Sequence, residues 1–99
     1  MRWFYLKDEN KFPVACVASD KEENMIVFSV STHNPVDPFD RDVARQVAIG
    51  RLTAKKFAGV VTDETGIKEK IVTKIAASKT LPARAIEAAN YWLSQRKTA

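Results

Sequence analysis

Short apolar runs alternate with polar clusters over the first third of the chain. Apolar, aromatic and β-branched residues dominate positions 2–7, 12–19 and 25–32, and charged or amide side chains fill the two gaps between these runs. Such runs, separated by only four or five polar residues, are typical of antiparallel neighbours, because a short loop turns the chain back on itself. The pattern therefore predicts a three-stranded β-meander within residues 1–36.

Alternation with a period of two divides the predicted strands between two faces of the sheet. In the first strand Phe4 and Leu6 share one face, and Trp3 and Tyr5 share the other. The third run divides in the same way, with one set made of Ile26, Phe28 and Val30 and the other of Met25, Val27 and Ser29. Neither face is wholly polar, which indicates a ligand surface, a dimer interface or helices on both sides. Burial under the C-terminal helices is the explanation we favour.

A helix start follows the third strand. Asp37 can accept hydrogen bonds from free backbone N–H groups as the N-cap, Pro38 suits the first helical position, and Asp40 can complete a capping box. The helix is predicted over about residues 38–57, and Gly59 lies just beyond as a stop signal.

On a helical wheel this basic helix has two stripes. The apolar stripe, which we expect to face the core, consists of Phe39, Val43, Val47, Gly50, Ala54 and Phe57. The cationic stripe on the broadly opposite side consists of Arg41, Arg45, Arg51, Lys55 and Lys56. The second stripe is therefore expected to face solvent or an anionic partner.

The rest of the chain predicts two further helices. Residues 60–62 can form a short extended segment, and the apolar positions beyond it recur at helical spacing. In the first of these helices they are Ile67, Ile71, Val72, Ile75 and Ala76, and in the last, which Pro82 begins, they are Ala85, Ile86, Ala89, Trp92 and Leu93. The sequence thus predicts one α+β domain over residues 1–99 in the order βββααα. Its parts are a sheet in residues 1–36, a basic helix in residues 37–58 and two helices in residues 63–97.

Composition and charge narrow the class of protein. The 99 residues are 45% hydrophobic and carry a net charge of +4, which is typical of an ordinary globular domain. One cysteine and one histidine cannot supply a zinc site, so we expect no metal and no cofactor. The apolar runs are too short for a signal peptide or a membrane span, so we expect a cytoplasmic protein that does not bind membranes. Residues 51–99 carry ten Lys and Arg against four Asp and Glu. An anionic partner would explain this excess, although an ordinary solvated surface is the more common explanation.

Two places could carry chemistry. His33 has hydroxyl neighbours and the acids Asp37 and Asp40, but no glycine-built oxyanion hole accompanies it, so we expect no hydrolytic site and no enzyme. The start of the basic helix is the stronger candidate, since free N–H groups, Arg41, Arg45 and His33 could meet a phosphate there. Three aspartates in the same turn oppose this, so we expect most of the attraction from the cationic stripe further along, at Arg45, Arg51, Lys55 and Lys56.

The junction between sheet and helix also resembles a known pattern. It contains Val30-Ser31, a loop with Pro35, then Asp37-Pro38-Phe39-Asp40-Arg41, Ala44-Arg45 and Ala48-Ile49-Gly50-Arg51-Leu52. In these elements residues 3–55 resemble small accessory proteins of bacteriophages and prophages, which share V-S, a proline loop, D-x-F-x-R and A-x-G-R-L. This chain departs from the pattern at Ala44, where glycine is often found. The resemblance carries no established activity, but it implies a phage-type accessory protein in a bacterial host cell, a class that often binds DNA or intercepts a host factor.

Two functions remain open at this stage. The first is binding of nucleic acid or a phosphate-bearing ligand through the basic helix, with Trp3 and Tyr5 available for base stacking. The second is a protein-binding inhibitor of a host enzyme or defence complex, for which a rigid surface with aromatic anchors is sufficient. A homodimer is compatible with either function.

Overall fold

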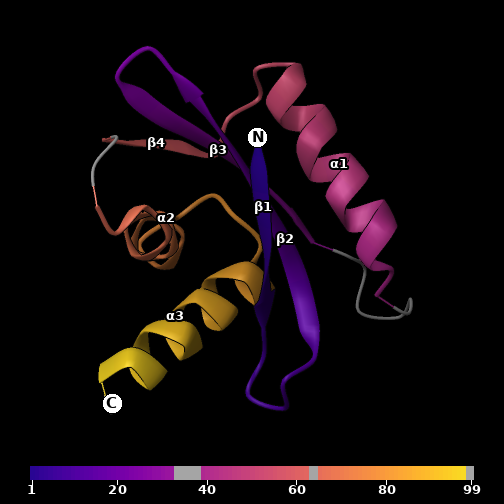
Figure 1. Ribbon diagram of the computed structural model, residues 1–99. Helices are drawn as coiled ribbons and strands as arrows, with labels where there is room; N and C mark the ends of the chain where they lie inside the picture. Colours follow the sequence, from indigo (N-terminus) through magenta and orange to yellow (C-terminus); the bar gives the residue numbers. More distant parts are fainter. Residues whose placement is uncertain (33–38, 63–64, 98–99) are drawn as a thin grey trace.

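The fold is seen in a computed structural model that describes residues 1–32, 39–62 and 65–97 (Figure 1). Its elements are β1 (Arg2–Lys7), β2 (Pro13–Glu22), β3 (Met25–Thr32), α1 (Arg41–Thr53), β4 (Gly59–Thr62), α2 (Ile67–Ala76) and α3 (Ala83–Lys97). The predicted α+β class is confirmed. Three helices are present as predicted, and none in the described part of the chain combines the length and the apolar character needed to cross a membrane.

The sheet has four strands in the order β1-β2-β3-β4, and every neighbouring pair is antiparallel. The predicted meander of three strands is therefore extended by one, and the order is βββαβαα instead of βββααα. In β4, Val60 pairs with Val27 and Val61 with Ile26. Four residues are too few for a periodic signal, so pairing with β3 is what makes this segment a strand. Gly59, expected as a helix stop, is the first residue of β4.

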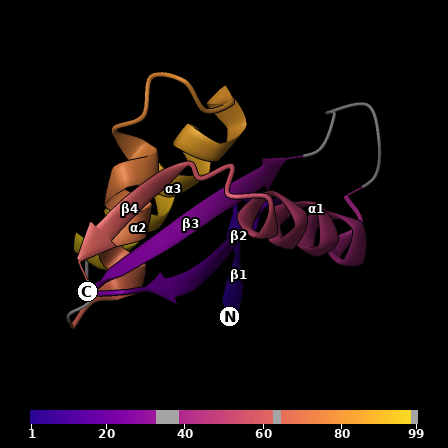
Figure 2. The same ribbon diagram turned by 90° about the horizontal axis from the view of Figure 1, so that it is seen from above.

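Helices cover both faces of the sheet, which resolves the question of its apolar second face. Figure 2 shows α1 on one side and α2 with α3 on the other. As alternation predicts, Phe4 and Leu6 belong to the face under α2 and α3, whereas Tyr5 packs toward α1. The expectation that the C-terminal helices alone account for the burial is wrong, because α1 shields the other face.

The larger part of the core lies between the sheet and the pair α2 and α3. Its largest fully buried side chains are Leu6, Val17, Phe28, Ile71, Val72 and Ile75. Ala85 and Ala89 place α3 against this core, with Trp92 and Leu93 packed at its margin as predicted. Ile86 of the predicted stripe is only partly buried, and Ala88 belongs to the core instead. The smaller part lies under α1 and consists of Cys16, Ala18, Val27, Ala44, Ala48 and Leu52.

Helix α1 is shorter than the predicted helix over residues 38–57. Its N-cap is Asp40, whose Oδ1 accepts hydrogen bonds from the N–H groups of Asp42 at 2.9 Å and Val43 at 3.2 Å. The assignment of Asp37 as the cap is therefore wrong; Asp37 and Pro38 lie outside the described residues. Both aspartates satisfy the sequence rule for an N-cap; in the structure the helix begins after Asp40, and Phe39 before it packs against Tyr5.

The buried face of α1 also differs from the predicted apolar stripe. Ala44, Ala48 and Leu52 are buried, whereas Val43 is 54% exposed and Val47 is 40% exposed. The sheet face beneath α1 is made largely of small side chains, so the helix approaches it closely through its alanines. Phe39 and Phe57 of the predicted stripe do pack against this part of the core. The wheel selected Val43 and Val47 wrongly because valine is more hydrophobic than alanine.

Candidate functional site

Two arginines of α1 lie over two aromatic rings of β1. The guanidinium carbon of Arg41 is 5.3 Å from the ring centroid of Tyr5, and that of Arg45 is 5.3 Å from the ring centroid of Trp3. Both distances are within the range of cation–π attraction. We call these four residues the β1–α1 surface, and all four are among the predicted binding residues.

The spacing of the two elements explains this pairing. Trp3 and Tyr5 stand two residues apart on one face of a strand, about 6.6 Å along it, and Arg41 and Arg45 stand four residues apart on a helix, about 6 Å along it. The two repeats are nearly equal, so each arginine meets one ring. A cation–aromatic row therefore follows from packing α1 on β2 and β3, with its two arginines reaching the rings of the neighbouring β1.

Tyr5 anchors one end of this row. Its hydroxyl donates a hydrogen bond of 3.1 Å to the backbone carbonyl of Arg41, and the Phe39 ring meets it edge-on with centroids 6.2 Å apart. An edge-to-face pair of this kind is a favourable aromatic contact. Tyr5 therefore holds the start of α1 against β1, in addition to its cation–π contact with Arg41.

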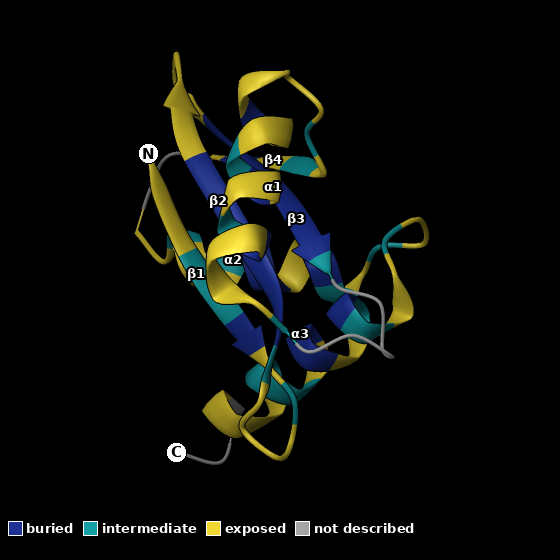
Figure 3. Ribbon diagram, turned by 90° about the vertical axis from the view of Figure 1, so that its right-hand side faces the viewer, coloured by how far each residue is buried: buried dark blue, intermediate teal, exposed yellow. Residues whose placement is uncertain are grey.

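Trp3 forms the open end of the row. It is 45% exposed, and Figure 3 shows that the first half of β1 is exposed where it runs beside α1. Arg45 also makes an ion pair of 3.3 Å with Asp42, and both partners are accessible to solvent. An exposed pair of this type contributes little to stability, so the guanidinium can exchange Asp42 for another anion at small cost.

The other predicted cations lie apart from this row. The Nη1 of Arg51 donates a 2.6 Å hydrogen bond to the carbonyl of Val30, beyond the stretch of β3 that β4 pairs with. Lys55 forms a 3.9 Å ion pair with Glu22, the last residue of β2, and the backbone carbonyl of Lys56 accepts from Ser29 Oγ at 3.0 Å. The predicted cationic stripe is therefore divided between the β1 side and the β3 side of the helix, and Arg51 has a structural contact.

Nucleophilic groups near the junction have structural partners. Ser29 and Ser31 are buried and donate to backbone carbonyls in and just after α1. Burial raises the pKa of the Cys16 thiol to about 11, so it is neutral and unreactive at neutral pH. His33, the remaining predicted site residue, lies outside the described residues. In the described part of the chain no group of three or more His, Cys, Asp and Glu side chains could hold a metal ion.

A second cation–aromatic cluster, which the sequence patterns did not reveal, lies on the opposite face. The Nζ of Lys68 is 4.9 Å from the ring centroid of Phe4 and 5.7 Å from that of Trp92, and Arg96 lies 4.9 Å from the same Trp92 centroid. Arg96 also pairs with Glu69 at 3.6 Å. These residues come from three separate elements, so no local spacing in the sequence could have indicated them.

Comparisons with known proteins do not assign this site to a family. No family model, no curated protein and no solved structure matches the chain.

Proposed function

We propose that the protein is a non-enzymatic accessory protein of phage type that binds nucleic acid through the β1–α1 surface, in the cytoplasm of a bacterial host. The observation that carries the proposal is Trp3, an exposed indole on an edge strand with the Arg45 guanidinium over its ring. Exposed aromatic rings with neighbouring arginines are the usual means of holding nucleic acid bases and phosphates together.

The chemistry of the row supports this ligand. A guanidinium that stacks on a ring still presents N–H groups along its edge, and these match the oxygens of a phosphate. The ring that it covers can in turn stack on a base. The net charge of +6 over residues 51–99 supports association with a polyanion through long-range attraction.

The test is fluorescence anisotropy with labelled single-stranded and duplex oligonucleotides at several salt concentrations. We expect binding that weakens steeply with salt, and we expect R41Q/R45Q to lower the slope of log affinity against log salt by about 2. The matched control is K11Q/K79Q, which removes the same charge from two exposed loop positions and should bind like the unchanged protein. Absence of binding at the lowest salt concentration removes the proposal.

A protein-binding inhibitor is the second candidate, and the exposed valines of α1 favour it. Val43 and Val47 are one turn apart and form an apolar strip on the exposed surface of α1. Such strips serve as anchors in protein interfaces. A stoichiometric partner that is recovered from bacterial lysate by the unchanged protein but not by V43D/V47D would support this function over the first.

A further inference from the structure

The two rings of the β1–α1 surface differ in how much area they leave for a ligand. Tyr5 is half-buried, with Arg41 over its ring, Phe39 at its edge and its hydroxyl bonded to the backbone of α1. Trp3 is 45% exposed and lies opposite Ala18 of β2, whose small side chain is fully buried. The indole therefore stands above its neighbour on the sheet, and a base that approaches this surface meets Trp3 first.

The exposed side of the indole is turned away from α1. Helix α1 packs on β2 and β3, so the guanidinium of Arg45 reaches Trp3 from the inner side of the sheet. β1 is an edge strand, no described strand lies beyond it, and its first half is exposed (Figure 3). Arg45 thus covers the inner face of the ring and leaves the outer face to solvent. A ring with a cation on one face can receive a base on the other.

Stacking on Trp3 requires a base whose own face is accessible. In a duplex the neighbouring base pairs cover both faces, so an indole reaches a base only if that base leaves the stack. The cost of unstacking is comparable with the gain from stacking on one aromatic ring, and the two nearly cancel. In a single strand the gain is kept, because the faces of the bases are already accessible. Trp3 therefore favours a single strand over a duplex.

Helix α1 also lacks the surface of a helix that enters the major groove. Two of its outward side chains are Val43, 54% exposed, and Val47, 40% exposed, and neither forms hydrogen bonds with base edges. A helix in the groove has a phosphate backbone on each side, so both of its flanks need available cations. On the β3 flank, Arg51 donates instead to the carbonyl of Val30. The β1 flank is left to hold one strand, in the angle between α1 and β1.

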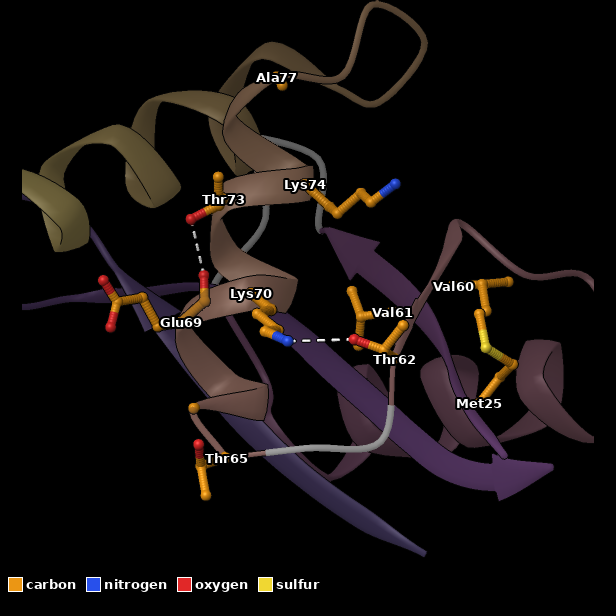
Figure 4. Close-up of a pocket in the computed structure, with 11 residues that line it drawn as sticks. Met25, Val60, Val61, Thr62, Thr65, Glu69, Lys70, Thr73, Lys74 and Ala77 are labelled. Carbon is orange, nitrogen blue, oxygen red and sulfur yellow. Dashed lines mark hydrogen bonds between the residues drawn. The ribbon is translucent and has the colours of Figure 1, made fainter. Parts of the chain in front are cut away.

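A groove between β4 and α2 is the alternative place for a strand of nucleic acid. It has a volume of about 830 Å³ and is lined on the sheet side by Met25, Val60 and Val61 and on the α2 side by a stripe that includes Lys70 and Lys74 (Figure 4). None of the described residues that line it is aromatic. The groove therefore has no ring on which a base could stack, and its lysines provide a control for charge alone.

Asp42 occupies the place on Arg45 that a phosphate would take. Its Oδ1 lies 3.3 Å from Nη2 of Arg45, and its side chain is 76% exposed. An ion pair so accessible to solvent is weak, and a phosphate offers the guanidinium a better-matched set of oxygens than a single carboxylate oxygen at this distance. Asp42 therefore competes with the ligand for Arg45, and its removal should strengthen binding.

We propose that the β1–α1 surface binds single-stranded nucleic acid in preference to duplex. One base stacks on the outer face of Trp3, and a phosphate of the same strand replaces Asp42 on Arg45. This preference rests on the proposed binding of nucleic acid and specifies its ligand. Both contacts are to parts that every nucleotide has, so binding depends little on base sequence. Neither contact involves a residue outside the described part of the chain.

The first experiment measures fluorescence anisotropy at low salt with labelled oligo-dT and with a dA·dT duplex of the same length. We expect the single strand to bind about tenfold or more tightly than the duplex. Equal binding of the two probes, or tighter binding of the duplex, would overturn the preference and leave the proposed function standing. Binding of neither probe would remove both.

Trp3→Leu tests the stacking contact, because it removes the ring and keeps an apolar side chain. It should weaken binding of oligo-dT about fivefold or more and abolish most of the preference over duplex. Trp92→Leu removes the other indole, on the opposite face of the sheet, and is the matched control. It should bind both probes like the unchanged protein, and thermal unfolding should show that both variants are folded. Equal losses in the two variants would contradict stacking at Trp3.

Asp42→Asn tests the exchange of anions on Arg45. It should strengthen binding of oligo-dT about two- to fivefold, which is the range expected for loss of an exposed ion pair. Glu87→Gln makes the same change of charge on α3 and should give little gain. In an Arg45→Gln protein the gain from Asp42→Asn should disappear, since the group for which the two anions compete is absent. A gain that persists without Arg45, or an equal gain from Glu87→Gln, would overturn the exchange.

Arg45→Gln by itself should weaken binding of oligo-dT about fivefold or more at low salt. Lys74→Gln removes one charge from the groove between β4 and α2 and is its control; it should bind oligo-dT like the unchanged protein. An equal loss in both variants would show attraction by net charge alone and contradict a defined phosphate contact at Arg45.

Discussion

The hydroxyl of Ser31 donates a 2.6 Å hydrogen bond to the backbone carbonyl of Ala44, which joins β3 to the first turn of α1. Ser29, two residues earlier on the same face, donates to the carbonyl of Lys56, just beyond the end of the helix. Two buried serines therefore hold the helix at both ends. Together with the small residues between them, they set the distance and rotation of α1 and so bring Arg41 and Arg45 over β1.

Replacing Ser31 by alanine should destabilise the fold. The substitution removes a buried hydrogen bond, and we expect the free energy of unfolding to fall by about 1–2 kcal/mol in urea denaturation. Ser94→Ala is the matched control, because Ser94 makes a similar bond to the Tyr91 carbonyl on an exposed surface. An equal loss in both variants would show that the buried bond has no special role.

Alanine substitutions at Gly59 and Gly50 should change the stability of the fold in opposite directions. A Cβ at Gly59 would lie 2.7 Å from Cζ of Phe28, whereas a Cβ at Gly50 would meet nothing within 4 Å. We expect Gly59→Ala to cost about 1–3 kcal/mol, since the fully buried Phe28 ring must shift. Gly50→Ala should add about 0.5–1 kcal/mol, because it removes a glycine from the interior of α1. Thermal or urea unfolding measures both, and a stable G59A protein would contradict the contact.

The thiol of Cys16 should make stability depend on pH in the alkaline range. Burial raises its pKa from 9.0 to about 11, so between these values the unfolded chain loses the proton while the folded chain keeps it. The unfolded state then binds fewer protons, and stability falls as pH rises from about 9 to about 11. The unchanged protein should lose more stability over this range than Cys16→Ala. Parallel pH profiles for the two proteins would be inconsistent with the burial of the thiol.

The fluorescence of Trp3 should change when nucleic acid binds. The chain has two tryptophans, so Trp92→Phe leaves Trp3 as the single indole and Trp3→Phe leaves Trp92. We expect an oligonucleotide to quench the fluorescence of the first variant and to leave the second nearly unchanged, because base stacking occurs at Trp3. Trp3→Ala should weaken binding by about 1–3 kcal/mol. Quenching confined to Trp92 would instead place the ligand on the α2 and α3 face.

The sequence by itself determined the first three strands, the presence of three helices and the two faces of the sheet. The alternation in β1 and β3 places Phe4 and Phe28 on one side and Trp3 and Val27 on the other, as the structure has them, because the period of a strand is a local property of the backbone. The apolar positions of α2 were predicted equally well, because its most hydrophobic residues are also those in the core. In α3 the prediction holds for Ala85, Ala89, Trp92 and Leu93, whereas Ile86 is only partly buried and Ala88 is buried.

Only the tertiary structure decided the rotation of α1, the fourth strand and the partners of the arginines. Val43 and Val47 are more hydrophobic than Ala44 and Ala48, yet the alanines are buried, since the sheet offers small side chains and two serine hydroxyls at that place. The segment of β4 is a strand because an edge of β3 was free to pair with it. Arg45 meets Trp3 across 42 residues of sequence because α1 packs on β2 and β3 close enough for its arginines to reach β1, and that relation exists only once the chain has folded.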